Sequence, residues 1–262
     1  MDTPLAGTPA ALDDLGTPFA GPVGRVVSLV PSLTEAVAGT APGLLVGATD
    51  WCSHPPDLDV ARVRGTKNPD VAAVAGLRPD LVLANAEENR DVDLQALRAA
   101  GIAVWVTFPR TVPEALDSLR RMLAACGLAE PGWLGQAREV WAAPHDGPRR
   151  TAVVPVWRRP WMAVGSGTFT GDVLARLGVD NVLAGSPERY PRFTPPVTGA
   201  ELVVLPDEPY AFTPDDGPEA FPGAPAACVS GRHLTWYGPS LVEARALLTA
   251  QLAQALRETR GS

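Results

Sequence analysis

The stretch RVVSLVPSLTEAVAG, residues 25–39, decides the fold, because a strand signal in it runs directly into a helix signal. Residues 25–30 form a mostly apolar, β-branched run that is too short for a helix and suits a buried strand. Pro31 ends this strand, and Ser32 and Glu35 have the S-x-x-E spacing of a capping box that opens a helix. A strand that passes at once into a helix is the basic unit of an α/β fold.

The same unit recurs along the chain. In NPDVAAVAGLRPDLVLAN (68–85) and DVDLQALRAAGIAVWVT (91–107), a helical segment leads into an apolar strand. The pattern starts again with TAVVPVW (151–157), a predicted strand, and TFTGDVLARLG (168–178), a predicted helix. This alternation predicts two α/β lobes with mostly parallel sheets.

Pro- and Gly-rich segments suggest the domain boundaries. We expect residues 1–22, which are rich in Pro, Gly, Thr and Ala, to be a flexible lead-in. The N-terminal α/β lobe is expected over 23–110 and the C-terminal lobe over 147–262. Residues 111–146 form a helical segment that contains a single connecting backbone helix.

Composition and charge exclude several classes of protein. The net charge of -7 argues against a nucleic-acid binder. The sequence contains no apolar run long enough for membrane insertion. Cys52, Cys126 and Cys228 lie far apart, which is typical of reduced thiols in a cytosolic protein. Residues 1–24 have neither a basic n-region nor a lipid-attachment cysteine, so we expect a cytoplasmic protein.

The search for enzyme and metal motifs leaves one alternative open. The sequence contains no Walker A loop, HExxH or GxSxG motif. Glu87 or Glu88 as a base, with His233 as an acid, remains an enzyme alternative on a small organic substrate. Cys52 and His54 supply fewer ligands than a metal site needs, so we expect no structural metal.

Large aromatic residues follow the predicted strands. Ligands of α/β proteins bind outside the carboxyl ends of the strands. We therefore expect the rings there to form apolar walls for a flat or bulky ligand. They are Trp51, Trp157, Trp161, Tyr210, Trp236 and Tyr237.

Several segments carry a resemblance to a known family. RVVSLVPSLTEAV (25–37), VGATDWCSHPP (46–56) and VGSGTFTGDVLARLGVDNVLAG (164–185) resemble the class III periplasmic substrate-binding proteins. These helical-backbone metal receptors serve vitamin B12 and ferric-siderophore importers. The resemblance covers about residues 24–257. It implies two lobes joined by one long helix, near 131–143, with a ligand in the cleft between them.

The resemblance also implies a non-enzymatic binding protein with no intrinsic cofactor. A corrinoid is the favoured ligand, and haem or a ferric chelate are the alternatives. His233 is a candidate axial ligand, because neutral imidazole suits cobalt and iron. The predicted ligand-binding residues are Ser32, Trp51, Lys67, Glu88, Asn89, Trp157, Trp161, Phe193, Arg232, His233, Trp236 and Tyr237.

Three departures from the family pattern affect the expected location and ligand of the protein. The first is the missing export signal. The second is Lys67 in GTKNPD (65–70), where corrinoid receptors can carry an aromatic residue, and it favours an acidic group on the ligand. The third is the shortened segment PPVTGAELVV (195–204), which retains Glu201 but not the helix that docks on a permease. These departures favour a cytoplasmic binder of small molecules over a permease-docked subunit, although an importer subunit stays an alternative.

Overall fold

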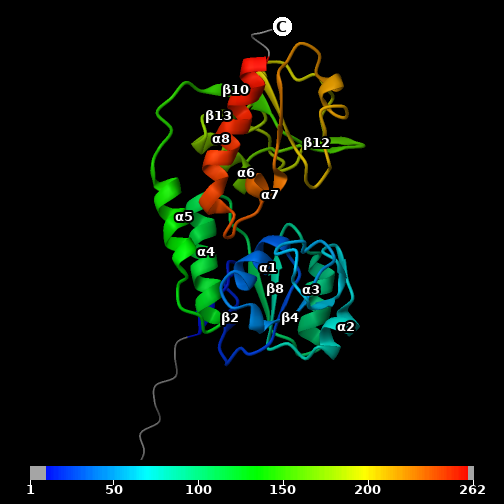
Figure 1. Cartoon of the computed structure of the whole chain (residues 1–262). Helices are drawn as coiled ribbons and strands as arrows, with labels where there is room; N and C mark the ends of the chain where they lie inside the picture. Colours follow the sequence, from blue (N-terminus) through cyan, green and yellow to red (C-terminus); the bar gives the residue numbers. More distant parts are fainter. Residues whose placement is uncertain (1–9, 259–262) are drawn as a thin grey trace, which may run out of the picture. The chain divides into compact units, whose positions relative to one another are not determined.

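The computed structural model describes residues 10–258 and divides the chain into two compact units (Figure 1). Unit 1 consists of Leu116–Leu134 and the described part of Met1–Phe108. Unit 2 consists of Pro109–Ala115 and the described part of Gly135–Ser262. The chain passes from unit 1 to unit 2 after Phe108, returns to unit 1 inside α4 (Val112–Ala125), and enters unit 2 again inside α5 (Gly132–Ala142).

Unit 1 is built on a sheet of five parallel strands in the order β5-β4-β3-β8-β9. The strands are β3 (Val26–Ser28), β4 (Leu45–Ala48), β5 (Ala61–Arg62), β8 (Leu81–Asn85) and β9 (Val104–Thr107). The accompanying helices are α1 (Pro31–Ala38), η1 (Pro42–Leu44), α2 (Val71–Gly76) and α3 (Asp91–Ala99). Two short antiparallel hairpins complete the unit, β1 (Ala11–Leu12) with β2 (Pro18–Phe19) and β6 (Arg64–Gly65) with β7 (Asn68–Pro69).

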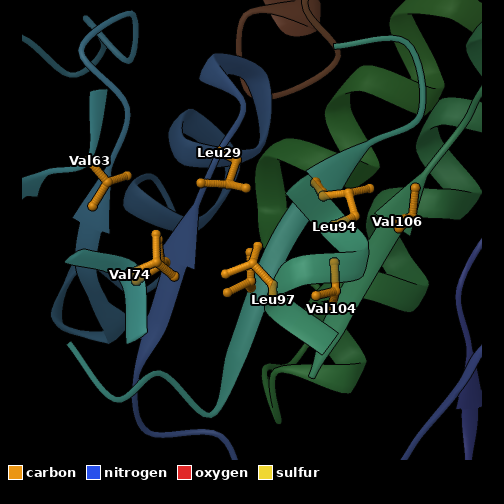
Figure 2. Close-up of a cluster of buried hydrophobic side chains, with 10 residues drawn as sticks. Leu29, Val63, Val74, Leu94, Leu97, Val104 and Val106 are labelled. Carbon is orange, nitrogen blue, oxygen red and sulfur yellow. The ribbon is translucent and has the colours of Figure 1, made fainter. Parts of the chain in front are cut away.

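The core on one face of this sheet joins the strands to α2 and α3 (Figure 2). Val74 of α2 and Leu97 of α3 are fully buried against alternate strand residues such as Val27 and Val82. The residues between these, including Leu81 and Leu83, point to the other face and are also buried. Burial on both faces explains why the strands read as continuous apolar runs in the sequence.

The N-terminal hairpin corrects the prediction of a flexible lead-in over residues 1–22. Residues 10–22 are part of unit 1, whereas residues 1–9 lie outside the described residues. Asp13 is buried, and its side chain accepts hydrogen bonds from the backbone N–H groups of Thr17 and Val106. Asp14 pairs with Arg121 at 2.6 Å. Composition could not reveal these long-range partners.

The start of α1 corrects the predicted capping box. The N-cap residue is Val30, and Pro31 occupies the first helical position. Pro31 suits that position because its fixed φ is already helical and it has no N–H to satisfy. Ser32 and Glu35 both lie inside the helix and are buried.

Unit 2 has a second parallel sheet, of four strands in the order β13-β10-β14-β15. Its strands are β10 (Arg150–Val153), β13 (Val179–Asn181), β14 (Leu202–Pro206) and β15 (Ala226–Val229). A separate hairpin pairs β11 (Pro155–Arg158) with β12 (Trp161–Ala163). The helices are α6 (Phe169–Arg176), η2 (Pro218–Ala220), α7 (Gly231–Thr235) and α8 (Leu241–Glu258).

The two parallel sheets confirm the predicted fold class, while one strand boundary in unit 2 differs from the prediction. The sequence suggested one strand over 151–157, but β10 and β11 belong to different sheets. Pro155 begins β11, and because proline has no N–H it favours such a strand start. The helix predicted over 168–178 is present, and the Thr168 side chain caps it by accepting from the Gly171 N–H.

Candidate functional site

The loops at the carboxyl edge of the unit 1 sheet gather several of the predicted residues. Trp51 follows β4, and the segment of Glu88 and Asn89 follows β8. Lys67 lies in the turn of the β6–β7 hairpin, which comes directly after β5. Parallel strands end at one edge of a sheet, so these loops are neighbours in the fold although they are far apart in the sequence.

Trp51 is the most exposed large aromatic residue of this group, with 68% of its surface accessible. Its indole lies against Gly65 of the β6–β7 hairpin, where an added Cβ atom would be 3.2 Å from Trp51 Nε1. The Asp50 N–H also donates to the Arg64 carbonyl at 2.8 Å. The β4 loop and the hairpin therefore form one continuous surface.

Arg62 fixes the backbone of the loop that carries Trp51. Its Nη1 donates to the carbonyl oxygens of Thr49 and Cys52, each at 3.0 Å, and its Nη2 donates to that of Leu58 at 3.1 Å. A guanidinium can bridge three carbonyls because its donors are held in a rigid plane. Sequence reasoning missed this residue, because the partners of its guanidinium are backbone carbonyls.

Cys52 has a structural role below this loop. The thiol is fully buried and contacts the hydroxyl groups of Thr34 at 3.0 Å and Thr49 at 3.2 Å. Burial raises the pKa of the Cys52 thiol, although the two threonine hydrogen bonds oppose this effect. The thiol form is therefore favoured over the thiolate that metal binding requires.

Lys67 and Asn89 connect the hairpin turn to the β8 loop. The Lys67 ammonium donates to the carbonyl oxygen of Glu87. The Asn89 side chain is buried, donates to the Thr66 carbonyl at 2.9 Å and accepts from the Asn85 N–H at 2.9 Å. Asn89 therefore supports the loop, whereas Lys67 is exposed on the surface.

The aromatic residues of unit 2 fall into two groups. Trp157 is 43% exposed and packs edge-on against Tyr210, with ring centroids 5.7 Å apart. Trp161 is half-buried and stacks on Phe212 at 5.9 Å. Phe193 packs beside Trp161, and both belong to the margin of the hydrophobic core of unit 2.

The segment GRHLTWYGPS (231–240) forms helix α7 and the turn that precedes α8. His233 is buried, and both of its ring nitrogens have partners within unit 2. Nδ1 lies 2.7 Å from the Ser230 hydroxyl, and Nε2 lies 2.9 Å from Glu243 Oε1. Arg232 lies 3.5 Å from the same carboxylate oxygen. The hydrogen bond from His233 is the main cause that lowers the pKa of Glu243.

Trp236 and Tyr237 are buried, with only 6% of each residue exposed. The Trp236 indole N–H donates to Glu208 Oε2 at 2.9 Å, and Tyr237 packs against Phe169. Gly231 lies directly against the β14 loop, where a Cβ atom would be 2.6 Å from the backbone nitrogen of Glu208. These contacts tie the loops that follow β14 and β15 together.

A cavity of about 290 Å³ lies within unit 2, beside the start of α6. The turn over 165–168, together with Arg110 and Asp180, contributes to its wall. Asp180 in turn forms an ion pair with Arg149. The sequence did not point to this cavity, because GSGTFTG reads there as an ordinary turn before a capped helix.

Residues 10–258 lack two features. Within that range, we found no group of three or more His, Cys, Asp or Glu side chains that could hold a metal ion. Within the same range, no helix is both long enough and apolar enough to span a membrane.

Comparison with known proteins identifies related binding proteins. No family model matches the chain. A vitamin B12-binding protein of Vibrio cholerae is 24% identical over 194 residues, which cover 68% of this chain and 67% of the relative. The crystal structure of the periplasmic vitamin B12-binding protein of Vibrio cholerae superposes with a TM-score of 0.71 at 18% identity, covering 90% of this chain and 99% of that one. A periplasmic heme-binding protein from Roseiflexus gives 0.72 at 19% identity, with the same coverage.

The comparisons overturn the predicted cytoplasmic location. Both solved structures are named as periplasmic proteins. The prediction rested on the composition of the first residues, on the widely spaced cysteines and on the shortened segment 195–204, and none of these features identifies the compartment as directly as relatives of known location do. By sequence similarity and by fold, the resemblance of this chain to the class III periplasmic substrate-binding proteins is confirmed.

Proposed function

We propose that the chain is a binding protein for a metal-bearing macrocycle or metal chelate, held by loops at the carboxyl ends of its parallel strands. A corrinoid is the first candidate, and haem and ferric chelates are the alternatives. The carrying observation is Trp51, an indole that is 68% exposed on a loop whose backbone Arg62 fixes. Its setting is a fold shared with proteins named for vitamin B12 and heme.

An exposed, fixed indole suits such a ligand on physical grounds. A large apolar ring that stays in water forgoes the free energy of burial, and a flat ligand would recover it. A loop that is already ordered loses little conformational entropy on binding. Trp157, the second exposed tryptophan, lies in β11, the hairpin strand that follows β10 in the chain.

The enzyme alternative has less support. It required His233 as an acid opposite Glu87 or Glu88, but the His233 ring is paired with Ser230 and Glu243. Those same pairs also leave His233 poorly placed as an axial ligand. The relatives are named as binding proteins, which agrees with a non-enzymatic role.

The place of action follows the relatives. We infer that the protein works outside the cytoplasm, as the periplasmic proteins of the same fold do. Glu201, the residue that resembles a permease-docking glutamate, accepts hydrogen bonds from Thr151 and pairs with Arg150 at 3.1 Å. Its carboxylate is therefore engaged within unit 2, and we do not propose permease docking through it.

The test is a titration of the purified chain with cyanocobalamin, dicyanocobinamide and haemin. We expect at least one of them to quench tryptophan fluorescence saturably, with a Kd in the micromolar range or below. Trp51→Phe removes most of the quench, while Trp133→Phe, a half-buried residue of the same unit that bonds Thr40, retains it. Absence of saturable binding by all three ligands, and by a ferric catecholate titrated in the same way, would refute the proposed function.

A further inference from the structure

The surface beside Trp51 carries the single lysine of this sequence, and its chemistry narrows the ligand class. Lys67 lies in the turn between β6 and β7, two residues after Gly65, the residue that contacts the Trp51 indole. The turn is held from below, because Asn89 donates to the Thr66 carbonyl and Thr66 is buried. The ammonium group thus belongs to the same hairpin as Gly65, which lies against the exposed Trp51 ring.

The ammonium is oriented but keeps capacity for another partner. It donates to the carbonyl oxygen of Glu87, which uses one of its three N–H donors. The carboxylate of Glu88 lies within electrostatic range of the same charge. In the absence of a ligand, Glu88 therefore offsets part of the charge on Lys67.

We propose that Trp51 and Lys67 form a subsite for a planar ligand that carries a carboxylate at its edge, with the ring against the indole and the carboxylate on the ammonium. This inference rests on the proposed function and selects, among its ligands, those with acidic side chains over fully amidated or esterified ones. A charge-assisted hydrogen bond beside an apolar wall is stronger than one in open water, because the wall excludes solvent. The Arg64 guanidinium of the same hairpin is already paired with Asp70, so Lys67 is the cation that remains for the ligand.

The experiment uses the full chain and two matched pairs of probes. Dicyanocobyrinic acid, with peripheral carboxylates, is compared with dicyanocobinamide, whose side chains are amides. Haemin is compared with its dimethyl ester. Within each pair the ring and the metal are the same, so the difference in Kd reports on the peripheral side chains, and the Lys67 variants show which part of it comes from the carboxylates.

Three substitutions make the comparison specific. We expect Lys67→Met to weaken binding of the acidic member of a pair about tenfold, the scale of one charged hydrogen bond, and to change the other member less than about twofold. Glu88→Gln should tighten binding of the acidic member, since it removes the competing charge. Arg64→Met, which removes a cation already paired with Asp70, should leave the preference within a pair unchanged.

The outcomes separate the two ideas. If Lys67→Met weakens the binding of the acidic and the non-acidic probe equally, or weakens neither, the carboxylate subsite is refuted. The proposed binding function is then unaffected. If wild-type protein binds none of these probes, this inference fails, and if it also binds none of the ligands of the first titration, the proposed function fails with it. Circular dichroism of each variant checks that the fold is retained, and Lys67→Arg should keep the preference.

Discussion

Trp51 of unit 1 and Trp161 of unit 2 differ sharply in how far they are exposed to water. In unit 1, Trp51 stands 68% exposed on a loop fixed by Arg62. In unit 2, Trp161 stacks among Phe193, Phe212 and Phe221 at the margin of the core. The comparison teaches that an aromatic residue after a strand is a ligand surface only when its neighbours leave it uncovered.

The largest expected effect is the loss of stability when Trp161 is replaced. We expect Trp161→Ala to lower the free energy of unfolding by about 3 kcal/mol, because the large ring leaves a cavity among three phenylalanines. Trp51→Ala should change stability by less than about 0.5 kcal/mol, as surface substitutions usually do. Urea denaturation of both variants measures the difference. Equal destabilisation by the two substitutions would contradict the contrast.

A close backbone contact tests how tightly the loops of unit 2 are joined. Gly231→Ala places a Cβ atom 2.6 Å from the Glu208 backbone nitrogen, so the β14 and β15 loops must move apart. We expect a loss of about 2 kcal/mol in the free energy of unfolding, the usual scale of overpacking. Gly185→Ala is the control in the same unit, since a Cβ there meets no atom within 4 Å. A harmless Gly231→Ala would show that these loops are loosely joined.

Arg62 tests whether the exposed indole of unit 1 depends on a fixed loop. Arg62→Met removes hydrogen bonds to three carbonyl oxygens. We expect ligand affinity to fall about fivefold, or about 1 kcal/mol, because the loop must then be ordered on binding. Fluorescence titration gives the Kd, and the faster local motion of Trp51 should appear as lower fluorescence anisotropy.

The matched control for Arg62 is Arg64→Met. It removes an arginine from the neighbouring strand whose guanidinium pairs with Asp70 instead of holding the Trp51 loop. Affinity and anisotropy should then stay close to wild type. An equal fall in both variants would mean that general loss of positive charge, and not loop order, weakens binding.

The smallest expected effect concerns pH and the α7–α8 contact of unit 2. The pKa of Glu243 is below its ordinary value of 4.5, mainly because His233 donates a hydrogen bond to it. The unfolded chain therefore binds a proton more readily than the folded one, and this contribution to stability is lost as the pH falls below about 4.5. Glu243→Gln should remove a small part of the acid destabilisation. Thermal unfolding of both proteins, measured from about pH 3 to about pH 7, gives the pH dependence of their stability. If the two stability curves ran parallel over this range, Glu243 would not be the group responsible.

The sequence was informative where local pattern and burial agree. The β-branched run at 25–30 and its repeats are buried on both sheet faces, so their apolar composition was enough to predict two parallel α/β lobes. The helix predicted over 168–178 has the same local origin, since its cap, Thr168, accepts from the Gly171 N–H three residues away. The failures at Ser32 and in residues 10–22 have the opposite origin. Pro31, and not Ser32, lies at the start of the helix. The buried Asp13 bonds to Val106, which is 93 residues further along the chain, and no local pattern can indicate such a partner.

The amino-acid sequence by itself determined the alternation of strands and helices in the two units, and it placed aromatic residues near the ends of the predicted strands. Tertiary structure alone decided which of those residues face water. Trp51 and Trp157 stay exposed, whereas Trp236 is covered and bonded to Glu208. Exposure depends on atoms brought together from distant segments, and side-chain periodicity carries information only about near neighbours. For the same reason, only the folded chain shows Arg62 holding the Trp51 loop and Lys67 donating to the β8 loop.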